Sequence, residues 1–335
     1  MLEMSKNLRE SPEMETDPFS DVLSFVNAQS IVSGGFTAGG AWAIRFPAPD
    51  KLKFFALVKG GCWLNIDGGE APIRVEEGDV FLLSARRSFI LAADLEAFPL
   101  DAVSLFAGSH GKVTTIGEGE DCVLLGGSVR LDPACGGLLA DVLPPLIHVR
   151  AASPQATVLH WLLDQLVRER NGELPGAGLA AMQLAQLIFV QILRAHLAAS
   201  GTLAAGWLRA IADKRLEPAL RLIHGDPGRP WQLEELAKAA AMSRTSFAQH
   251  FKAVAGVAPF AYLTAWRMRL AERALRDEDT PVSVLAGLLG YTSESAFSNA
   301  FKRATGNAPK RYRISVRKIE ATSSIPTPAL QERIA

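Results

Sequence analysis

Short apolar runs alternate with glycine-rich turns along the first part of the chain, from about residue 19 to about residue 130. The runs are four or five residues long and cover residues 42–46, 54–58, 62–66, 80–83 and 89–92. Turn residues lie around them at Gly34-Gly35, Gly39-Gly40, Gly60-Gly61, Asp67-Gly68-Gly69 and Glu77-Gly78-Asp79. Strands that recur about every ten residues between glycine turns are typical of a β-sandwich or β-barrel. We therefore expect a β-rich domain here.

The hydrophobic period changes after Pro154. Apolar residues recur at spacings of three and four over residues 158–170 and 179–197, which predicts two amphipathic helices separated by the breaker segment 171–176. Gln, Arg and His residues interrupt the apolar stretch 178–199, which favours a packed helix over a membrane span. The apolar stripes of both helices can pack on the β-rich domain or pair with a second subunit.

A Gly- and Ala-rich stretch at residues 200–206 marks the next boundary. A helix is expected over about residues 208–224, and Gly and Pro residues break the chain at 225–230. The polar first 16 residues are expected to be disordered, and the Ser-, Thr- and Pro-rich residues after about 317 to form a flexible tail.

Two segments in the last third of the chain repeat each other at an offset of fifty residues. The first reads Phe247-x3-Phe251-Lys252-x3-Gly256-x2-Pro259, and the second reads Phe297-x3-Phe301-Lys302-x3-Gly306-x2-Pro309. Ser243 and Ser293 lie four residues before the first Phe of each copy, where a hydroxyl can cap a helix. Short apolar helix patterns precede the copies at residues 233–241 and 282–289. A helix, a tight turn and a second, serine-capped helix make a helix-turn-helix, and two are predicted.

The second helix of each unit has an apolar face and a polar face. Phe247 and Phe251 are four residues apart and so share the face expected to meet the core. The opposite face of the first unit presents Arg244, Thr245, Ala248, Gln249 and Lys252. That of the second presents Glu294, Ser295, Ser298, Asn299 and Lys302, followed by the basic cluster Arg303, Lys310, Arg311 and Arg313. Such faces suit DNA, because Arg pairs with guanine, Gln pairs with adenine, and positive charges meet phosphates.

The segment between the two units predicts one long helix. Residues 260–276 contain neither Gly nor Pro, and Pro259 stands where a helix can start. A helix of about 17 residues is roughly 25 Å long. With the units at its ends, the second helices can lie about one DNA turn (~34 Å) apart and enter neighbouring major grooves.

Charge adds an asymmetry to this picture. Apolar residues make up 48% of the chain and charged residues 21%, which is ordinary for a soluble globular protein, and the net charge is zero. Residues 205–320 nevertheless carry 19 Lys and Arg against 11 Asp and Glu, whereas residues 1–204 carry 15 against 23. The basic part also carries the repeat, which indicates that this part meets a polyanion.

Signals for catalysis are weak. Cys62, Cys122 and Cys135 show no CxxC spacing, so buried structural thiols are the simplest interpretation. No Ser-His-Asp, Cys-His or paired-carboxylate pattern and no Gly-rich phosphate loop can be recognised. The first 16 residues lack the apolar run of a signal peptide, and we expect a cytoplasmic protein that is not an enzyme.

The C-terminal part closely resembles the DNA-binding domain of the AraC/XylS family of transcription regulators, over about residues 210–313. The most specific stretch is LLGYTSESAFSNAFKRATGNAPKRYR, residues 288–313. The resemblance implies two helix-turn-helix units on a linking helix. It also implies base-reading residues at Thr245, Ala248, Gln249, Ser295, Ala296 and Asn299. Because Thr245 and Ala248 are small, the first unit is expected to read bases more through Arg244 and Gln249. Activation, with RNA polymerase as a partner, is the family default.

Residues 17–200 resemble the cupin-type domain found at the N-terminus of some of these regulators, in the stretches 33–69 and 144–150. The resemblance implies a domain that senses a small molecule and helps the chain to form a homodimer. Candidate ligand-binding residues are the polar or aromatic residues nearest to the strand runs: Trp42, Arg45, Lys53, Trp63 and Arg74. Trp42 and Trp63 also suit a hydrophobic core, because large aromatics dominate cores.

A metal-dependent cupin enzyme is the main rival interpretation. Such sites use two or three His and a carboxylate, yet none of the six His lies between residues 42 and 91. Relatives often carry His where Phe55 and Phe89 stand. We therefore expect no metal, no cofactor and no catalytic residue.

Together these patterns predict an α+β multidomain protein, with an N-terminal cupin-like β-barrel, a helical linker and a C-terminal all-α domain with two helix-turn-helix motifs. The expected regions are an extension (1–16), a cupin-like sensor (17–150), a helical linker or dimerisation segment (151–204), a DNA-binding domain (205–316) and a tail (317–335). The expected function is ligand- or dimerisation-controlled, sequence-specific regulation of transcription on double-stranded DNA. A cupin metalloenzyme fused to a DNA-binding domain and a non-specific architectural DNA binder are the alternatives.

Overall fold

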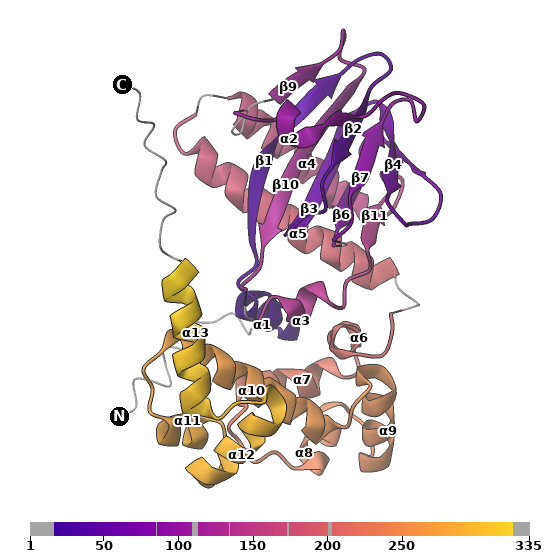
Figure 1. Ribbon diagram of the computed structural model, residues 1–335. Coiled ribbons are helices and arrows are strands. Elements are labelled where there is room, and N and C mark those ends of the chain that lie inside the picture. The colour runs from indigo at the N-terminus through magenta and orange to yellow at the C-terminus, as the bar shows by residue number, and fades with distance from the viewer. Residues whose placement is uncertain are drawn as a thin grey trace, which may run out of the picture. The chain divides into compact units, whose positions relative to one another are not determined.

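The computed structural model describes residues 17–323, except residues 85, 109–112, 134, 173 and 200–202. This part of the chain divides into two compact units (Figure 1). Residues 22–203 form the first unit, and residues 17–21 with residues 204–323 form the second. The predicted extension at residues 1–16 and residues 324–335 of the predicted tail lie outside the described residues.

Two sheets build the first unit. The larger sheet has the strand order β11-β6-β3-β10-β1-β9. Its strands are β1 (Gln29–Ala38), β3 (Leu52–Lys59), β6 (Val80–Leu83), β9 (Val113–Ile116), β10 (Cys122–Arg130) and β11 (Leu146–Val149). The smaller sheet has the order β5-β4-β7-β2-β8. Its strands are β2 (Ala43–Phe46), β4 (Gly61–Ile66), β5 (Ile73–Glu76), β7 (Phe89–Ala92) and β8 (Leu100–Asp101). The five predicted apolar runs are β2, β3, β4, β6 and β7, which confirms the β-rich domain.

Phenylalanine rings fill the core of this unit. Phe46 stacks on Phe89 at a centroid distance of 4.8 Å, and Phe55 stacks on Phe81 at 5.2 Å. Because side chains alternate along a strand, Phe55 belongs to this core while its neighbour Phe54 is buried on the other face of β3. The alternation explains why β3 reads as a continuous apolar run.

The two helices predicted after Pro154 are α4 (Ala156–Asn171) and α5 (Ala177–Ala199). They pack on each other, and α5 also contacts β1, β6 and β11. The Gln186 side-chain oxygen accepts a hydrogen bond from the Ser30 backbone nitrogen of β1, at 3.0 Å. By length and composition alone, α5 is apolar enough to cross a membrane. Its packing on the larger sheet agrees with the predicted packed helix. Two shorter helices, α2 (Ala102–Leu105) and α3 (Gly137–Ala140), complete the unit, and α1 (Pro18–Phe25) has its first residues in the second unit and its last residues in the first.

One predicted turn is wrong. Gly34 and Gly35 lie inside β1, and the register of β1 with β10 shifts between Val32 and Gly34. Gly34 has a φ of 145°, which a glycine adopts without strain. A glycine inside a strand often marks such a bulge, because the extra residue bends the strand.

The single helix predicted over about residues 208–224 is also wrong, because the chain forms α6 (Trp207–Ala212) and α7 (Glu217–Gly225) instead. The Asp213 carboxylate accepts hydrogen bonds from the backbone nitrogens of Arg215 (2.8 Å) and Leu216 (3.2 Å). An aspartate that bonds the backbone two and three residues ahead competes with the helical hydrogen bonds and so starts a new helix.

The second unit contains both predicted helix-turn-helix pairs. Helices α8 (Leu233–Ala239) and α9 (Arg244–Ala255) form the first pair, and α11 (Val282–Leu288) and α12 (Glu294–Thr305) form the second. The predicted linking helix is α10 (Pro259–Asp277). Its 19 residues give a length of about 28 Å.

The last helix, α13 (Pro309–Ser323), continues past residue 317, where the tail was expected to begin. The Arg317 guanidinium donates hydrogen bonds to the backbone oxygens of Arg276 (3.1 Å) and Glu278 (2.7 Å). These contacts hold α13 to the end of α10 at Arg317, where the sequence predicts the start of a flexible tail.

The turns of the two helix-turn-helix units differ by one residue. Met242 and Tyr291 occupy equivalent places, because their backbone nitrogens donate to Ala237 and Ala286 in the same way. The residue before each has a positive φ, 52° at Ala241 and 76° at Gly290. One residue, Thr292, then separates Tyr291 from the capping serine of the second unit.

We expect opposite effects from exchanging the residue types at the two equivalent turn positions. Ala241→Gly should raise the free energy of unfolding by up to about 1 kcal/mol, because the left-handed conformation costs an L-residue about that much. Gly290→Ala should lower it by more than about 2 kcal/mol. Its new Cβ would combine this strain with a position 2.1 Å from the Gly228 carbonyl oxygen. Urea unfolding of the full chain measures both, and a stabilising Gly290→Ala would contradict the assignment of the turns.

Candidate nucleic-acid interface

The second helices of the two units, α9 and α12, begin and end alike. The Ser243 hydroxyl accepts a hydrogen bond from the Ser246 backbone nitrogen at 3.2 Å, and the Ser293 hydroxyl accepts one from Ala296 at 3.1 Å. Gly256 and Gly306 end the helices with φ values of 75° and 78°. Both helices are 12 residues long, so the repeat in sequence becomes a repeat in geometry.

Each helix buries its phenylalanine pair. Phe247, Phe251, Phe297 and Phe301 are all 0% exposed. Phe251 meets the ring of Tyr262 edge-on at 5.5 Å, and Phe301 meets Tyr312 edge-on at 5.3 Å. The predicted apolar face is therefore the buried face, and the rotation of each helix about its axis is set by these rings.

The opposite face carries the predicted DNA-binding side chains. Ala248 and Ser298 are half-buried, and the remaining predicted residues of the two helices are exposed: Arg244, Thr245, Gln249, Lys252, Ser295, Asn299, Lys302 and Arg303. Ala296, which the family resemblance adds to this set, is exposed as well. The structure thus places the predicted residues together on two equivalent surfaces.

The basic residues that follow α12 do not share one environment. Lys310 and Arg311 are exposed, and the Lys310 ammonium lies 3.9 Å from the Glu294 carboxylate. Arg313 is half-buried, and its guanidinium donates a hydrogen bond to the Thr280 carbonyl oxygen. We therefore assign Arg313 a role in holding α13 to the loop before α11, whereas Lys310 and Arg311 stay available to phosphates.

Arg267 is a residue that the sequence analysis missed. It lies on α10 and donates hydrogen bonds from Nε to the Pro227 carbonyl oxygen (2.6 Å) and from Nη2 to the Arg229 carbonyl oxygen (3.0 Å). Its guanidinium also lies 5.9 Å from the ring centroid of Tyr291, which belongs to the turn of the second helix-turn-helix. The Arg267 side chain is half-buried, and this burial lowers the pKa of its guanidinium.

The Arg267 contacts join the loop before the first helix-turn-helix to the turn of the second. The two segments also touch directly, because a Cβ on Gly228 would lie 2.3 Å from the Leu288 carbonyl oxygen. We call Arg267, Gly228 and Gly290 the inter-unit clamp, because they connect the two helix-turn-helix units of the DNA-binding domain. No sequence signal reveals it, because the partners of Arg267 are backbone oxygens, which every residue type carries.

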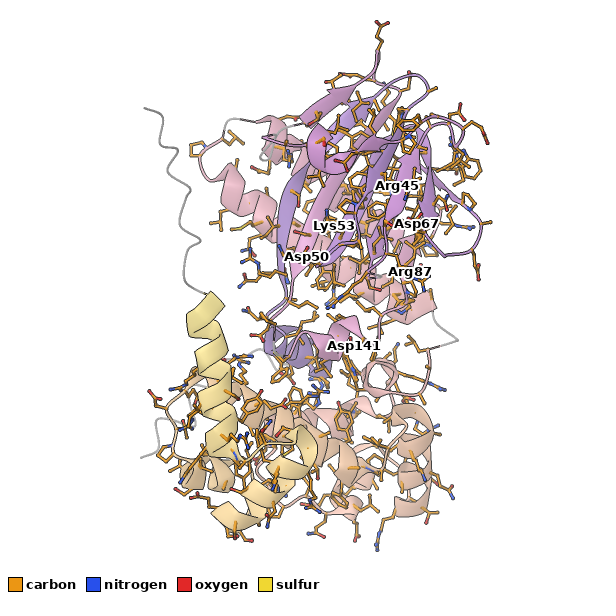
Figure 2. The ribbon with its side chains drawn as sticks, viewed as in Figure 1. Arg45, Asp50, Lys53, Asp67, Arg87 and Asp141 are labelled. Atoms are coloured by element: carbon orange, nitrogen blue, oxygen red, sulfur yellow. The ribbon has the colours of Figure 1, made fainter. Side chains whose placement is uncertain are left out.

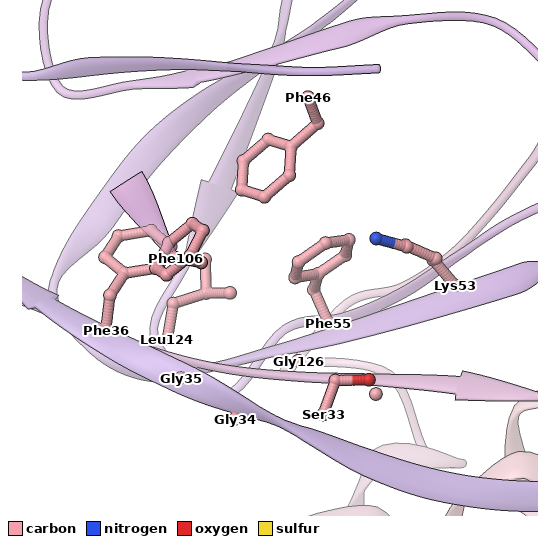
Figure 3. A pocket seen from close by; sticks show the side chains of 11 residues that line it. Ser33, Gly34, Gly35, Phe36, Phe46, Lys53, Phe55, Phe106, Leu124 and Gly126 are labelled. Atoms are coloured by element: carbon pink, nitrogen blue, oxygen red, sulfur yellow. The ribbon is translucent and has the colours of Figure 1, made fainter. Parts of the chain in front are cut away.

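Of the five predicted ligand-binding residues in the β-rich unit, four do not line the cavity bounded by Phe36, Phe46, Phe55 and Phe106. Trp42 is buried in the core against Phe36, and Arg74 lies over the Trp63 ring at 5.5 Å. Arg45 is exposed and forms an ion pair with Asp67 at 2.7 Å (Figure 2). Only Lys53 lines the cavity, which has a volume of about 210 Å³ (Figure 3).

The positions that matter for a cupin metal site are filled by aromatic rings. Phe55 and Phe89 lie edge-to-face at 5.7 Å inside the core. Over the described ranges, no three His, Cys, Asp or Glu side chains come together in a way that could hold a metal ion. His148, the histidine on β11, instead lies 2.7 Å from the Asp79 carboxylate, which also accepts a hydrogen bond from the Ala151 backbone nitrogen. These two residues fasten the end of β11 to the turn before β6.

Two serine-capped helices with polar outer faces, joined through one helix, define a double helix-turn-helix DNA-binding protein. Comparison with known proteins agrees. Residues 17–198 match the cupin domain family, and residues 236–315 match the helix-turn-helix domain family. The chain belongs to the AraC-like transcription regulators that carry a cupin domain at the N-terminus.

A putative AraC-like transcription regulator of Streptomyces antibioticus is 41% identical over 297 residues, which cover 89% of this chain and 98% of the relative. The transcriptional regulator AlkR of Acinetobacter baylyi is 30% identical over 282 residues, 82% of this chain and 91% of AlkR. Among solved structures, the DNA-binding domain of AdpA in complex with a target DNA is 30% identical, with a TM-score of 0.31. It covers 32% of this chain and 97% of that domain.

The two faces of α9 and α12 predict two classes of mutant. Arg244→Ala and Asn299→Ala should change base preference by about 1–3 kcal/mol per lost contact and leave the free energy of unfolding nearly unchanged. Phe247→Ala and Phe301→Ala should instead destabilise the protein by about 3–5 kcal/mol. Urea unfolding together with binding to selected duplexes distinguishes the classes. Unfolding of the polar mutants and not of the Phe mutants would mean that the faces are reversed.

A variant that breaks the inter-unit clamp should weaken binding only to a duplex that carries both half-sites. Arg267→Gln removes charged hydrogen bonds to two backbone oxygens, so the second unit should lose its fixed orientation. Affinity for a duplex with both half-sites should fall about tenfold, while affinity for a duplex with one half-site should change little. Arg273→Gln is the matched control, because Arg273 lies on the same helix in an exposed ion pair with Asp277. Equal losses for the two variants would show that the clamp does not orient the units.

Proposed function

We propose that this AraC-family transcription regulator, which has a DNA-binding helix-turn-helix domain, is a cytoplasmic activator that binds DNA as a homodimer. In this proposal each subunit reads two successive major grooves, and the cupin domain controls the protein through a small-molecule effector or through dimerisation. In this proposal α9 and α12 are the recognition helices, and RNA polymerase is the partner that responds to the bound protein.

The observation that carries the proposal is the pair of matched recognition helices. Each buries two phenylalanines and presents polar side chains from its first turn outward. The N-terminal residues of a recognition helix are the ones that reach base edges. Arg244 and Thr245 hold these positions in α9, and Ser295 and Ala296 hold them in α12. Gln249 and Asn299 follow about one turn later on the same face.

The homodimer proposal is supported by the outer surface of α4 and α5. Trp161 is 59% exposed and Val158 49% on α4, and Leu179 is 61% exposed, Leu187 47% and Met182 46% on α5. Isolated exposed apolar residues are ordinary, but five on two neighbouring helices suit a contact with a second copy of the chain. Pairing would place four recognition helices on one operator and raise affinity through effective concentration.

The alternatives have less support. The relatives are transcription regulators, which favours a protein without enzymatic activity. A purely architectural binder would need no base-reading side chains, yet Arg244, Gln249 and Asn299 have the chemistry for direct readout. Such a binder would lose affinity with salt equally on all sequences.

Selection of genomic fragments by the full-length protein tests the proposal. The expected result is a recurrent motif with two blocks whose centres lie about 10–10.5 base pairs apart. Arg244→Ala should relax one block and Asn299→Ala the other, because the two residues belong to different units. Enrichment of fragments without a motif would contradict sequence-specific regulation and favour the architectural alternative.

A further inference from the structure

The cavity of the first unit has aromatic walls on several sides. Phe36 of β1, Phe46 of β2, Phe55 of β3, Leu124 of β10 and Phe106, which follows α2, line it. These rings form a continuous network: Phe46 lies 5.7 Å from Phe55 and 6.0 Å from Phe106, and Phe106 lies 6.1 Å from Phe36. Walls of this kind favour a ligand with an apolar, preferably planar, body.

Glycines form the remaining wall. Gly34 on β1 pairs with Gly126 on β10, and Gly35 and Gly127 follow them on the lining. A Cβ on Gly126 would lie 3.2 Å from the Phe55 ring, so that position faces the aromatic side of the cavity. The missing side chain at Gly126 leaves space open beside Phe55, whereas a Cβ on Gly127 would meet Phe54 on the other face of β3.

The volume limits the size of an occupant. A dry apolar cavity of about 150 Å³ holds one benzene molecule. At about 210 Å³, this cavity has room for one aromatic ring or short alkyl chain together with a small polar group. It is below the range of pockets that hold larger organic ligands.

Lys53 is the one charged residue on the lining. It lies two positions before Phe55 on β3, so the alternation of the strand directs both side chains to the same face. Among the described residues, Lys53 has no hydrogen-bond or ion-pair partner, and Figure 3 shows its ammonium beside the Phe55 ring. The nearby Asp50 carboxylate lies 3.7 Å from the Lys51 ammonium, and its charge also raises the pKa of Lys53, by less than burial lowers it. Burial lowers the pKa of Lys53, so an anion at this place would relieve an unfavourable desolvation.

We propose that this cavity binds a small, mainly apolar molecule that carries one carboxylate, with the ligand body among the phenylalanines and the carboxylate on the Lys53 ammonium. A single cation among apolar walls selects one negative charge, because a second charge would be buried without a partner. Ser33, which also lines the cavity, supplies a hydroxyl that can donate to the same carboxylate. This proposal names the chemical class of the effector in the proposed function. It rests on that function only for the statement that ligand binding controls the regulator.

Titration calorimetry on the full-length chain, without DNA, tests the site with benzoate, phenylacetate and hexanoate as probes. At least one of the three should bind, and its uncharged amide should bind about tenfold more weakly or worse, because it lacks the charge-assisted contact. Phenethylamine, which carries a positive charge, should not bind. No binding of any carboxylate at concentrations up to about 10 mM, or equal binding of acid and amide, would overturn the proposal.

Three variants assign the binding to Lys53. Lys53→Met keeps the length and apolar stem of the side chain and should weaken carboxylate binding about tenfold or more, without affecting the amide. Lys53→Arg should retain binding, which keeps the test valid if the methionine variant folds poorly. Lys59→Met is the matched control, because Lys59 is the exposed lysine at the end of the same strand. Unchanged carboxylate binding by a folded Lys53→Met would overturn the assignment.

A parallel measurement of DNA binding by the same samples separates the two proposals. If the protein selects its DNA motif but binds none of the carboxylates, the cavity proposal is contradicted and the proposed regulation is not. Carboxylate binding by a protein that selects no DNA motif supports the cavity and contradicts the proposed regulation.

Discussion

The DNA-binding half of this protein depends on the inter-unit clamp. A single helix, α10, joins two helix-turn-helix units, and the second unit has a core of its own around Phe297 and Phe301. Met268, Ala271 and Leu275 of α10 belong to this core, so packing on α10 helps to orient the second helix-turn-helix. Gly228 against Gly290, with Arg267 bonded to the backbone on one side and beside Tyr291 on the other, provides a second connection. Two connections define the relative orientation of the two helix-turn-helix units, and the proposed reading of two grooves at once requires a defined orientation.

The clamp also explains why the two units are similar but not identical. Both use the same serine cap, phenylalanine pair and glycine stop, because these features set the rotation and length of a recognition helix. The turn is where they differ: Ala241 tolerates a positive φ in open surroundings, whereas the Gly290 position is pressed against another backbone and excludes any side chain. The duplicated parts present side chains to DNA, and the differing part fastens one unit to the other.

The N-terminal half uses a cupin fold without the histidines that a metal site needs. Phenylalanines 55 and 89 belong to the aromatic core, so the interior that could hold a metal is apolar. What remains is a small cavity with glycines on one wall and one lysine at its edge. Such an interior suits the proposed recognition of a ligand by shape and by a single charge. It also suits the proposed effector sensing, because a non-covalently bound ligand can leave again unchanged.

The sequence by itself determined the elements and their repetition: the strand runs, the recognition helices with their buried and exposed faces, the linking helix and the charge asymmetry. These features depend on residues two to four positions apart, whose relation the backbone geometry sets locally. Only the tertiary structure decided that Gly34 lies in a bulge opposite β10, that Asp213 divides a helix, that Arg313 holds a loop, and that Lys53 rather than Trp42, Arg45, Trp63 or Arg74 faces the cavity. The break at Asp213 depends on local hydrogen bonds, but each of the other outcomes depends on which distant strand, carbonyl or ring becomes a neighbour, and that information is spread over the whole chain.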